Sequence, residues 1–153
     1  MIDNQQKIAI ILRGVPGSGK STFVDMLLAA YPMSAIHAID DLHRDADGNF
    51  IWNEPKTRAL YLLNFANFVK SCESQIALVI CDCINVKASD FEPYLEAAKE
   101  FGYKAYVVVP DMPSPAICSV RNKHGVKKHQ IEEMFNTWEN WPIVGEEIQN
   151  EIV

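Results

Sequence analysis

The stretch GVPGSGKS at residues 14–21 fits the phosphate-binding pattern G-x-x-x-x-G-K-[ST] at every constrained position. An apolar run at residues 8–12 precedes it and predicts a buried strand, and residues 22–30 predict a helix after it. Strand, glycine loop and helix form the context that this motif requires. In such a loop, backbone N–H groups turn toward a phosphate, and the helix N-terminus adds the positive end of its dipole. The sequence therefore predicts a site for a nucleoside triphosphate.

Individual residues of this stretch have expected roles toward ATP. Lys20 is expected to reach the β- and γ-phosphates, and the Ser21 hydroxyl to ligate Mg²⁺. The residues expected to bind the nucleotide are Gly14, Pro16, Gly17, Ser18, Gly19, Lys20, Ser21 and Thr22. A chance glycine-rich turn is the competing interpretation, and the strand and helix on either side argue against it.

Length and composition indicate one domain with an ordinary core. The chain has 153 residues, of which 48% are hydrophobic and 22% charged, as is usual for a globular protein. No stretch approaches the roughly 20 apolar residues of a membrane span, and residues 1–7 lack the apolar segment of a signal peptide. We therefore expect a cytoplasmic protein without a membrane partner.

The net charge and the cysteines argue against some classes of function. The formal net charge is −6, so a polynucleotide substrate would require a local cluster of basic side chains. The four cysteines form no C-x-x-C pair, which argues against a zinc or redox motif and favours reduced thiols.

Four apolar runs predict the strands of one sheet, at residues 8–12, 35–39, 76–81 and 105–109. Segments with helical periodicity separate these runs, which predicts a three-layer α/β/α fold with a mainly parallel sheet of four to five strands. We expect a single domain with its core at residues 7–139 and a C-terminal extension at residues 140–153. The tail from residue 139 onward is expected to dock loosely.

Capping residues predict where several helices begin. A long helix is expected to start near Asn53. The next is expected to have Ser89 or Asp90 as its cap, and Ser114 followed by Pro115 predicts another start.

Acidic residues follow the second predicted strand. In open α/β sheets, ligands gather beyond the carboxyl ends of the strands. A carboxylate of Asp40 or Asp41 at this place is suited to accept the proton of an attacking hydroxyl during phosphoryl transfer. The alternative is that one or both cap a turn. The residues alone do not choose between the two carboxylates.

Two polar residues follow the third predicted strand. Asp82 closes that strand and is expected to bind Mg²⁺ directly or through water. The competing interpretation is a turn carboxylate at the end of a strand. Asn85 is suited to orient either a loop or a phosphate, and the sequence leaves both open.

A basic segment, RNKHGVKKH at residues 121–129, follows the fourth predicted strand and a short helix. Arg121 is suited to stabilise charge on a transferred phosphoryl group. It is therefore also expected to contact the bound nucleotide. Gly125 ends its helix and predicts the hinge of a lid. A solvated basic face is the alternative. Because Gly125 occupies the fourth position of N-K-x-D, a guanine-specific site is not expected.

These pieces together resemble the kinase domain of polynucleotide 5′-hydroxyl kinases and the small ATP-binding kinase domains related to it. The matching segments are RGVPGSGKST at residues 13–22, Asp40-Asp41, DCIN at residues 82–85 and RNKHG at residues 121–125. The resemblance implies a P-loop NTPase fold that uses ATP and Mg²⁺. It also implies that Asp40 is the general base and that Arg121 is the lid arginine that contacts the donor phosphates.

The chain departs from this family pattern on the acceptor side. The acceptor-contacting arginine of the family falls at His43, with Arg44 one place late, and Ile84 stands where threonine is usual. The residues expected to bind the acceptor are Asp41, His43, Arg44 and Asn85.

The leading hypothesis is a kinase that transfers the γ-phosphate of ATP to the 5′-hydroxyl of a DNA or RNA end. The first alternative is a nucleoside, nucleotide or other small-molecule kinase, although four arginines are few for a monophosphate clamp. The second alternative is an ATP-binding switch or interaction protein without transfer activity.

Overall fold

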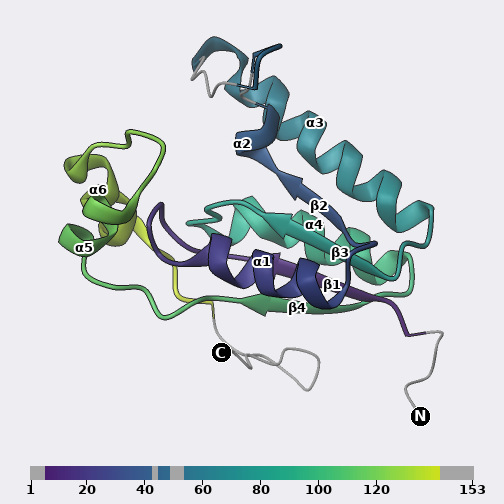
Figure 1. Ribbon diagram of the computed structural model, residues 1–153. Coiled ribbons are helices and arrows are strands. Elements are labelled where there is room, and N and C mark those ends of the chain that lie inside the picture. The colour runs from purple at the N-terminus through teal and green to yellow at the C-terminus, as the bar shows by residue number, and fades with distance from the viewer. Residues whose placement is uncertain (1–5, 43–44, 49–53, 142–153) are drawn as a thin grey trace.

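A parallel four-stranded sheet forms the centre of the molecule (Figure 1). The computed structural model describes residues 6–42, 45–48 and 54–141. The strands are β1 (Ile8–Leu12), β2 (Ala35–Ala38), β3 (Leu78–Asp82) and β4 (Lys104–Val108), in the spatial order β2-β3-β1-β4. All three strand pairs are parallel. Because β1 lies between β3 and β4, the loop that leaves it starts near the middle of the carboxyl edge.

Helices cover both faces of this sheet, which confirms the predicted three-layer α/β/α class (Figure 1). The helix α1 (Lys20–Ala30) covers one face, and α3 (Glu54–Glu73) and α4 (Ala88–Glu100) cover the other. The short α2 (Ile39–Leu42) follows β2 directly. The helices α5 (Pro115–Arg121) and α6 (Lys128–Thr137) pack together beyond the carboxyl ends of the strands (Figure 1).

The core has two sides because successive side chains of a strand point to opposite faces. Ile10 and Leu12 of β1 pack with the apolar face of α1. Ala9 and Ile11 of the same strand pack with the aromatic residues of α3 and α4. The four cysteines are free, as the sequence predicts, and all four are buried. None of the helices in the described ranges combines the length and hydropathy needed to cross a membrane.

The structure corrects two predicted boundaries. The strand β2 ends at Ala38, so Asp40 and Asp41 lie on α2 and not on an extended strand end. The helix α4 begins at Ala88, before either predicted cap. Asp90 is its third residue, and its carboxylate accepts a hydrogen bond of 3.0 Å from the backbone N–H of Lys87. The carboxylate satisfies an N–H ahead of the helix from inside the first turn.

Two other predicted helix starts agree with the structure to within one residue. Ser114 caps α5 as predicted, since its hydroxyl accepts from the N–H of Ile117 and Pro115 is the first helical residue. The helix α3 begins at Glu54, and the predicted start near Asn53 is within one residue of it. Asn53 itself lies outside the described residues.

A buried arginine joins three segments that are distant in the sequence. Arg13 is only 2% exposed and directly precedes the glycine loop. Its guanidinium donates hydrogen bonds to the backbone carbonyls of Asn85 at 2.8 Å, Val86 at 2.9 Å and Glu139 at 2.8 Å. The Glu139 N–H donates in turn to the Val86 carbonyl at 3.0 Å. The predicted loose docking from residue 139 onward is therefore wrong for Glu139.

Aromatic rings enclose the same guanidinium. Its central carbon lies 4.5 Å from the ring centre of Phe91 and 4.2 Å from that of Trp138. Stacking between two rings is a favourable setting for a planar, weakly hydrated cation. Burial lowers the pKa of Arg13, and the charges of Glu139 and Asp90 oppose that shift. Arg13 therefore ties the end of α6 and the loop after β3 to the phosphate loop.

Replacing Arg13 by methionine is expected to destabilise the protein by about 2–4 kcal/mol, because one buried and two partly buried main-chain carbonyls lose a charged donor. Arg58→Met, at an exposed position on α3, is the matched control and should change the stability little. Urea unfolding followed by circular dichroism measures both variants. Equal unfolding midpoints for the two variants would contradict the structural role of Arg13.

Candidate active site

The phosphate loop connects the end of β1 to the start of α1 and packs against α5. Gly17 has a φ of 80°, a conformation that favours glycine. A Cβ atom at Gly17 would overlap the backbone carbonyl of Cys118 on α5. Val15, Cys118 and Ile131 form a small buried cluster beneath the loop. The position of the α5–α6 unit is therefore set by direct packing against the loop.

Lys20 and Ser18 carry the polar groups of this loop. The Lys20 ammonium donates a hydrogen bond of 2.6 Å to the carbonyl of Gly14. Burial lowers the pKa of Lys20, and the nearby charges of Asp82 and Asp40 oppose the shift. The Ser18 hydroxyl is buried and has no hydrogen-bond partner among the described residues. A buried hydroxyl of this kind calls for a ligand or water to complete it.

Two carboxylates, those of Asp82 and Asp40, lie near the Lys20 ammonium, and Asp41 lies near Asp82. Asp82 ends β3, beside Leu12 of β1 in the register. Burial raises the pKa of Asp82, Lys20 opposes the shift, and Asp40 and Asp41 raise it further. These interactions show that the structure brings Lys20, Asp40, Asp41 and Asp82 together at the carboxyl edge of the sheet.

The residues predicted for Mg²⁺ are Ser21, in the first turn of α1, and Asp82. Among the described residues, no group of three or more His, Cys, Asp or Glu side chains is placed to hold a metal ion. The two predicted ligands supply a hydroxyl and a carboxylate, which are the donor types that Mg²⁺ prefers.

The predicted lid residues Arg121 and Gly125 lie in the α5–α6 unit with its connecting loop, residues 115–137, which we call the lid. Arg121 is exposed at the last position of α5. Burial raises the pKa of Cys118, and the charges of Arg121 and Lys20 oppose this, so both cations lie near the loop-contacting part of α5. Within the described part of the chain, Arg121 forms no ion pair. The contact of Arg121 with the donor phosphates stays a prediction.

His124 of the lid reaches the predicted base. Its Nε2 lies 3.3 Å from Oδ2 of Asp40. The sequence indicated no role for His124, although its place in the RNKHG segment that carries the family resemblance was an available signal. Asp40 thus contacts the lid through His124, and its charge also acts on the pKa of Lys20.

The residues predicted to bind the acceptor have separate outcomes. Asn85 is 6% exposed with a φ of 55°, and its amide donates a hydrogen bond of 2.7 Å to the carbonyl of Leu12. This geometry favours the loop-orienting alternative over acceptor binding, because the amide group is occupied by the main chain. Asp41 is exposed on α2 near the other carboxylates. His43 and Arg44 lie outside the described residues, so their roles stay predictions.

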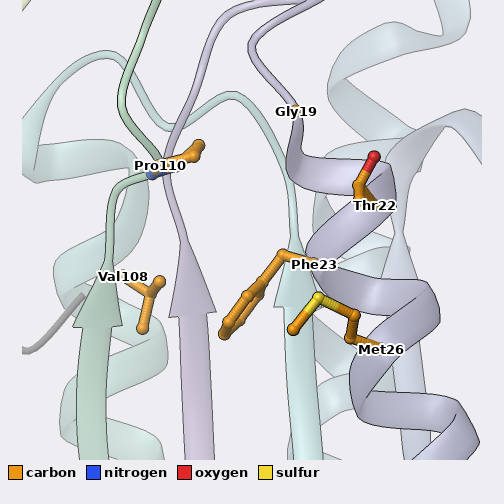
Figure 2. Close-up of a pocket in the computed structure, with 6 residues that line it drawn as sticks. All are labelled: Gly19, Thr22, Phe23, Met26, Val108 and Pro110. Carbon is orange, nitrogen blue, oxygen red and sulfur yellow. The ribbon is translucent and has the colours of Figure 1, made fainter. Parts of the chain in front are cut away.

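An open, mostly apolar pocket borders the phosphate loop on the β4 side. Figure 2 shows Phe23 and Met26 of α1 directed toward Val108 of β4, with Thr22 beside the loop. The residues that line the pocket are Gly19, Thr22, Phe23, Met26, Val108 and Pro110. An apolar surface beside a phosphate site is suited to hold the base of a nucleotide.

The glycine loop, the parallel sheet and the helices on both faces define a P-loop domain of the kinase-like kind. Residues 10–137 match the model of a family described as an AAA domain, AAA_33, and the chain belongs to that family.

Among curated proteins, the chain is 27% identical over 137 residues to NEDD4-binding protein 2 from Homo sapiens. The match covers 88% of this chain and 8% of that protein, so the chain spans less than a tenth of this relative.

Two solved structures show the same fold. A chain of the Pnkp1/Rnl/Hen1 RNA repair complex is 18% identical with a TM-score of 0.66, over 90% of this chain and 45% of that one. A gluconokinase from Sinorhizobium meliloti 1021 is 16% identical with a TM-score of 0.59, over 94% of this chain and 80% of that one.

Proposed function

We propose that this domain is an ATP- and Mg²⁺-dependent kinase that transfers the γ-phosphoryl group to a hydroxyl, in the first place the 5′-hydroxyl of a DNA or RNA end. The observation that carries the proposal is the grouping of Lys20, Asp82 and Asp40 at the mouth of the phosphate loop, beneath the lid. A site that only binds a nucleotide has no need of a carboxylate on the acceptor side.

The donor half of the site rests on the phosphate loop. Lys20 carries a partly buried ammonium that can leave the Gly14 carbonyl for a phosphate oxygen, and Ser18 holds a hydroxyl with no partner among the described residues in the same loop. Ser21 and Asp82 would hold Mg²⁺, which supplies charge neutralisation for the β- and γ-phosphates when bound. The apolar pocket beside Thr22 would take the adenine base. Arg121 would contact the donor phosphates from the lid.

The acceptor half rests on α2 and α3. The Asp40 carboxylate would accept the proton of the attacking hydroxyl, since it lies near the Lys20 ammonium that marks the transferred phosphate. Tyr61 of α3 is 43% exposed, and burial, followed by the charges of Cys83, Asp90 and Asp40, raises its pKa to about 12. The partly exposed ring of Tyr61, near Asp40, offers a stacking surface for a nucleobase of the acceptor.

A small-molecule acceptor is the second candidate function. The formal net charge of −6 favours it, because a polynucleotide would meet repulsion everywhere except at local basic groups. The similarity of the fold to that of a gluconokinase also supports this candidate. The polynucleotide end remains our first choice because of the matching segments at the two carboxylates and the lid.

An acceptor panel tests the proposal. ATP labelled at the γ-phosphate is offered with Mg²⁺ to 5′-hydroxyl DNA, 5′-hydroxyl RNA, nucleosides, nucleoside monophosphates and gluconate in parallel. We expect label on an oligonucleotide end, with transfer that weakens as salt is raised, because phosphate contacts release counterions. Label confined to a small molecule would support the second candidate. ATP turnover that labels no acceptor would contradict kinase function and favour a nucleotide-dependent switch.

A further inference from the structure

We propose that His124 is a positioning residue that holds the carboxylate of Asp40 from the lid, so that the base is oriented only when the lid is seated on the phosphate loop. The inference rests on the proposed function and adds a residue to it. It starts from the contact between Nε2 of His124 and Oδ2 of Asp40 at 3.3 Å.

The lid presents His124 on a braced turn. The amide of Asn122 donates to the carbonyls of Ser119 at 2.8 Å and Val126 at 3.1 Å. The side-chain oxygen of Asn122 also accepts from the N–H of Val126 at 3.0 Å. These hydrogen bonds close the chain around residues 122–126, so the position of His124 follows the position of the lid.

The lid is in turn fixed by the phosphate loop. The backbone of Cys118 fills the space where a side chain at Gly17 would lie, and Ile131 of α6 packs in the cluster with Val15. A lid that moved off the loop would carry His124 away from Asp40. The contact therefore couples the seating of the lid to the orientation of the base.

The backbone of α2 is held by the core, while the Asp40 carboxylate contacts the lid. Ile39 is buried in the core and Leu42 packs against it, whereas the side chain of Asp40 is 46% exposed and contacts His124. A hydrogen bond from the imidazole N–H to Oδ2 leaves Oδ1 to accept the proton of the hydroxyl. Among the described residues, Asp82 lies within electrostatic range of both Asp40 and His124, and of Lys20 and Asp41 as well.

The opposite role for this contact is a latch that withholds the base from the acceptor. The exposure of the pair argues against it, because the side chain of His124 is 33% exposed and that of Asp40 is 46% exposed. The contact occupies one carboxylate oxygen and leaves the residue open to an acceptor. A positioning role predicts that loss of His124 lowers the rate, whereas a latch predicts that it raises the rate.

The test compares His124→Ala with His129→Ala, which removes an exposed histidine of α6 in the same lid. We expect His124→Ala to lower kcat by about 10- to 10²-fold, because a small misplacement of a reacting group has effects of this size. The KM for ATP should stay close to that of the wild type, and His129→Ala should retain wild-type kcat. His124→Gln, which keeps an N–H donor, and added imidazole with His124→Ala should each restore part of the lost rate.

The contact itself has a readout that needs no turnover. In Asp40→Asn, the ring nitrogen resonances of His124 should shift while those of His129 stay in place. An unchanged or raised kcat in His124→Ala, a loss confined to the KM for ATP, or an unshifted His124 resonance would each overturn the inference. A wild-type protein that labels no acceptor would instead refute the proposed function, which keeps the two failures distinguishable.

Discussion

Lys20→Ala is expected to lower phosphate transfer by at least about 10²- to 10³-fold, the range seen when one preorganised group that stabilises developing charge is removed. The ammonium lies in the phosphate loop, 2.6 Å from the Gly14 carbonyl. Its charge opposes the upward pKa shift that burial imposes on Asp82. Without it, the transferred γ-phosphoryl group would lose one of the cations that compensate its charge.

The measurement for Lys20 is the initial rate of label transfer from γ-labelled ATP, beside the equilibrium affinity for ATP. Lys70→Ala, at an exposed position in the last turn of α3, is the matched control and should retain the wild-type rate. A Lys20→Ala protein that is folded and transfers phosphate at the wild-type rate would remove the loop from the reaction.

Asp40→Asn is expected to retain ATP binding and to lower kcat by about 10²- to 10⁴-fold, the usual contribution of a general base. Asparagine keeps the size of the side chain and loses the capacity to accept a proton. The loss should therefore appear in kcat and leave the affinity for ATP within a few-fold of wild type. Single-turnover transfer together with ATP titration separates the two quantities.

Asp41→Asn is the informative comparison for Asp40. Successive residues of a helix point about 100° apart, so the two carboxylates of α2 do not present the same face to the loop. We expect Asp41→Asn to raise the KM of the acceptor more than it lowers kcat, while Asp25→Asn on the exposed side of α1 changes neither. Near-full kcat in Asp40→Asn, or an equal loss of kcat in Asp41→Asn, would show that the base has been wrongly assigned.

The sheet and the phosphate loop were predictable because their signals are local. The run at residues 8–12 and the glycine pattern that follows it specify a strand and a loop from adjacent residues alone. All four predicted strands exist, and their boundaries differ from the structure by two residues at most. The α2 helix was missed because Asp40 and Asp41 follow an apolar run that resembles a longer strand.

The parts that were missed depend on contacts between distant segments. Arg13 precedes the loop in the sequence, but nothing local indicates that Phe91 and Trp138 will enclose it. The pairing of His124 with Asp40 likewise requires the lid to lie against the carboxyl edge of the sheet. Asn85 shows the reverse problem, since its residue type fits two roles and only the hydrogen bond to Leu12 favours one of them.

The most direct test of the account is label transfer from γ-labelled ATP to a 5′-hydroxyl oligonucleotide by wild-type protein, with Asp40→Asn assayed at the same ATP occupancy. We expect the wild type to label the 5′ end, and we expect Asp40→Asn to transfer label about 10²- to 10⁴-fold more slowly. If both proteins bind ATP and neither labels that oligonucleotide or any other hydroxyl acceptor, the grouping of Lys20, Asp82 and Asp40 is not a kinase site.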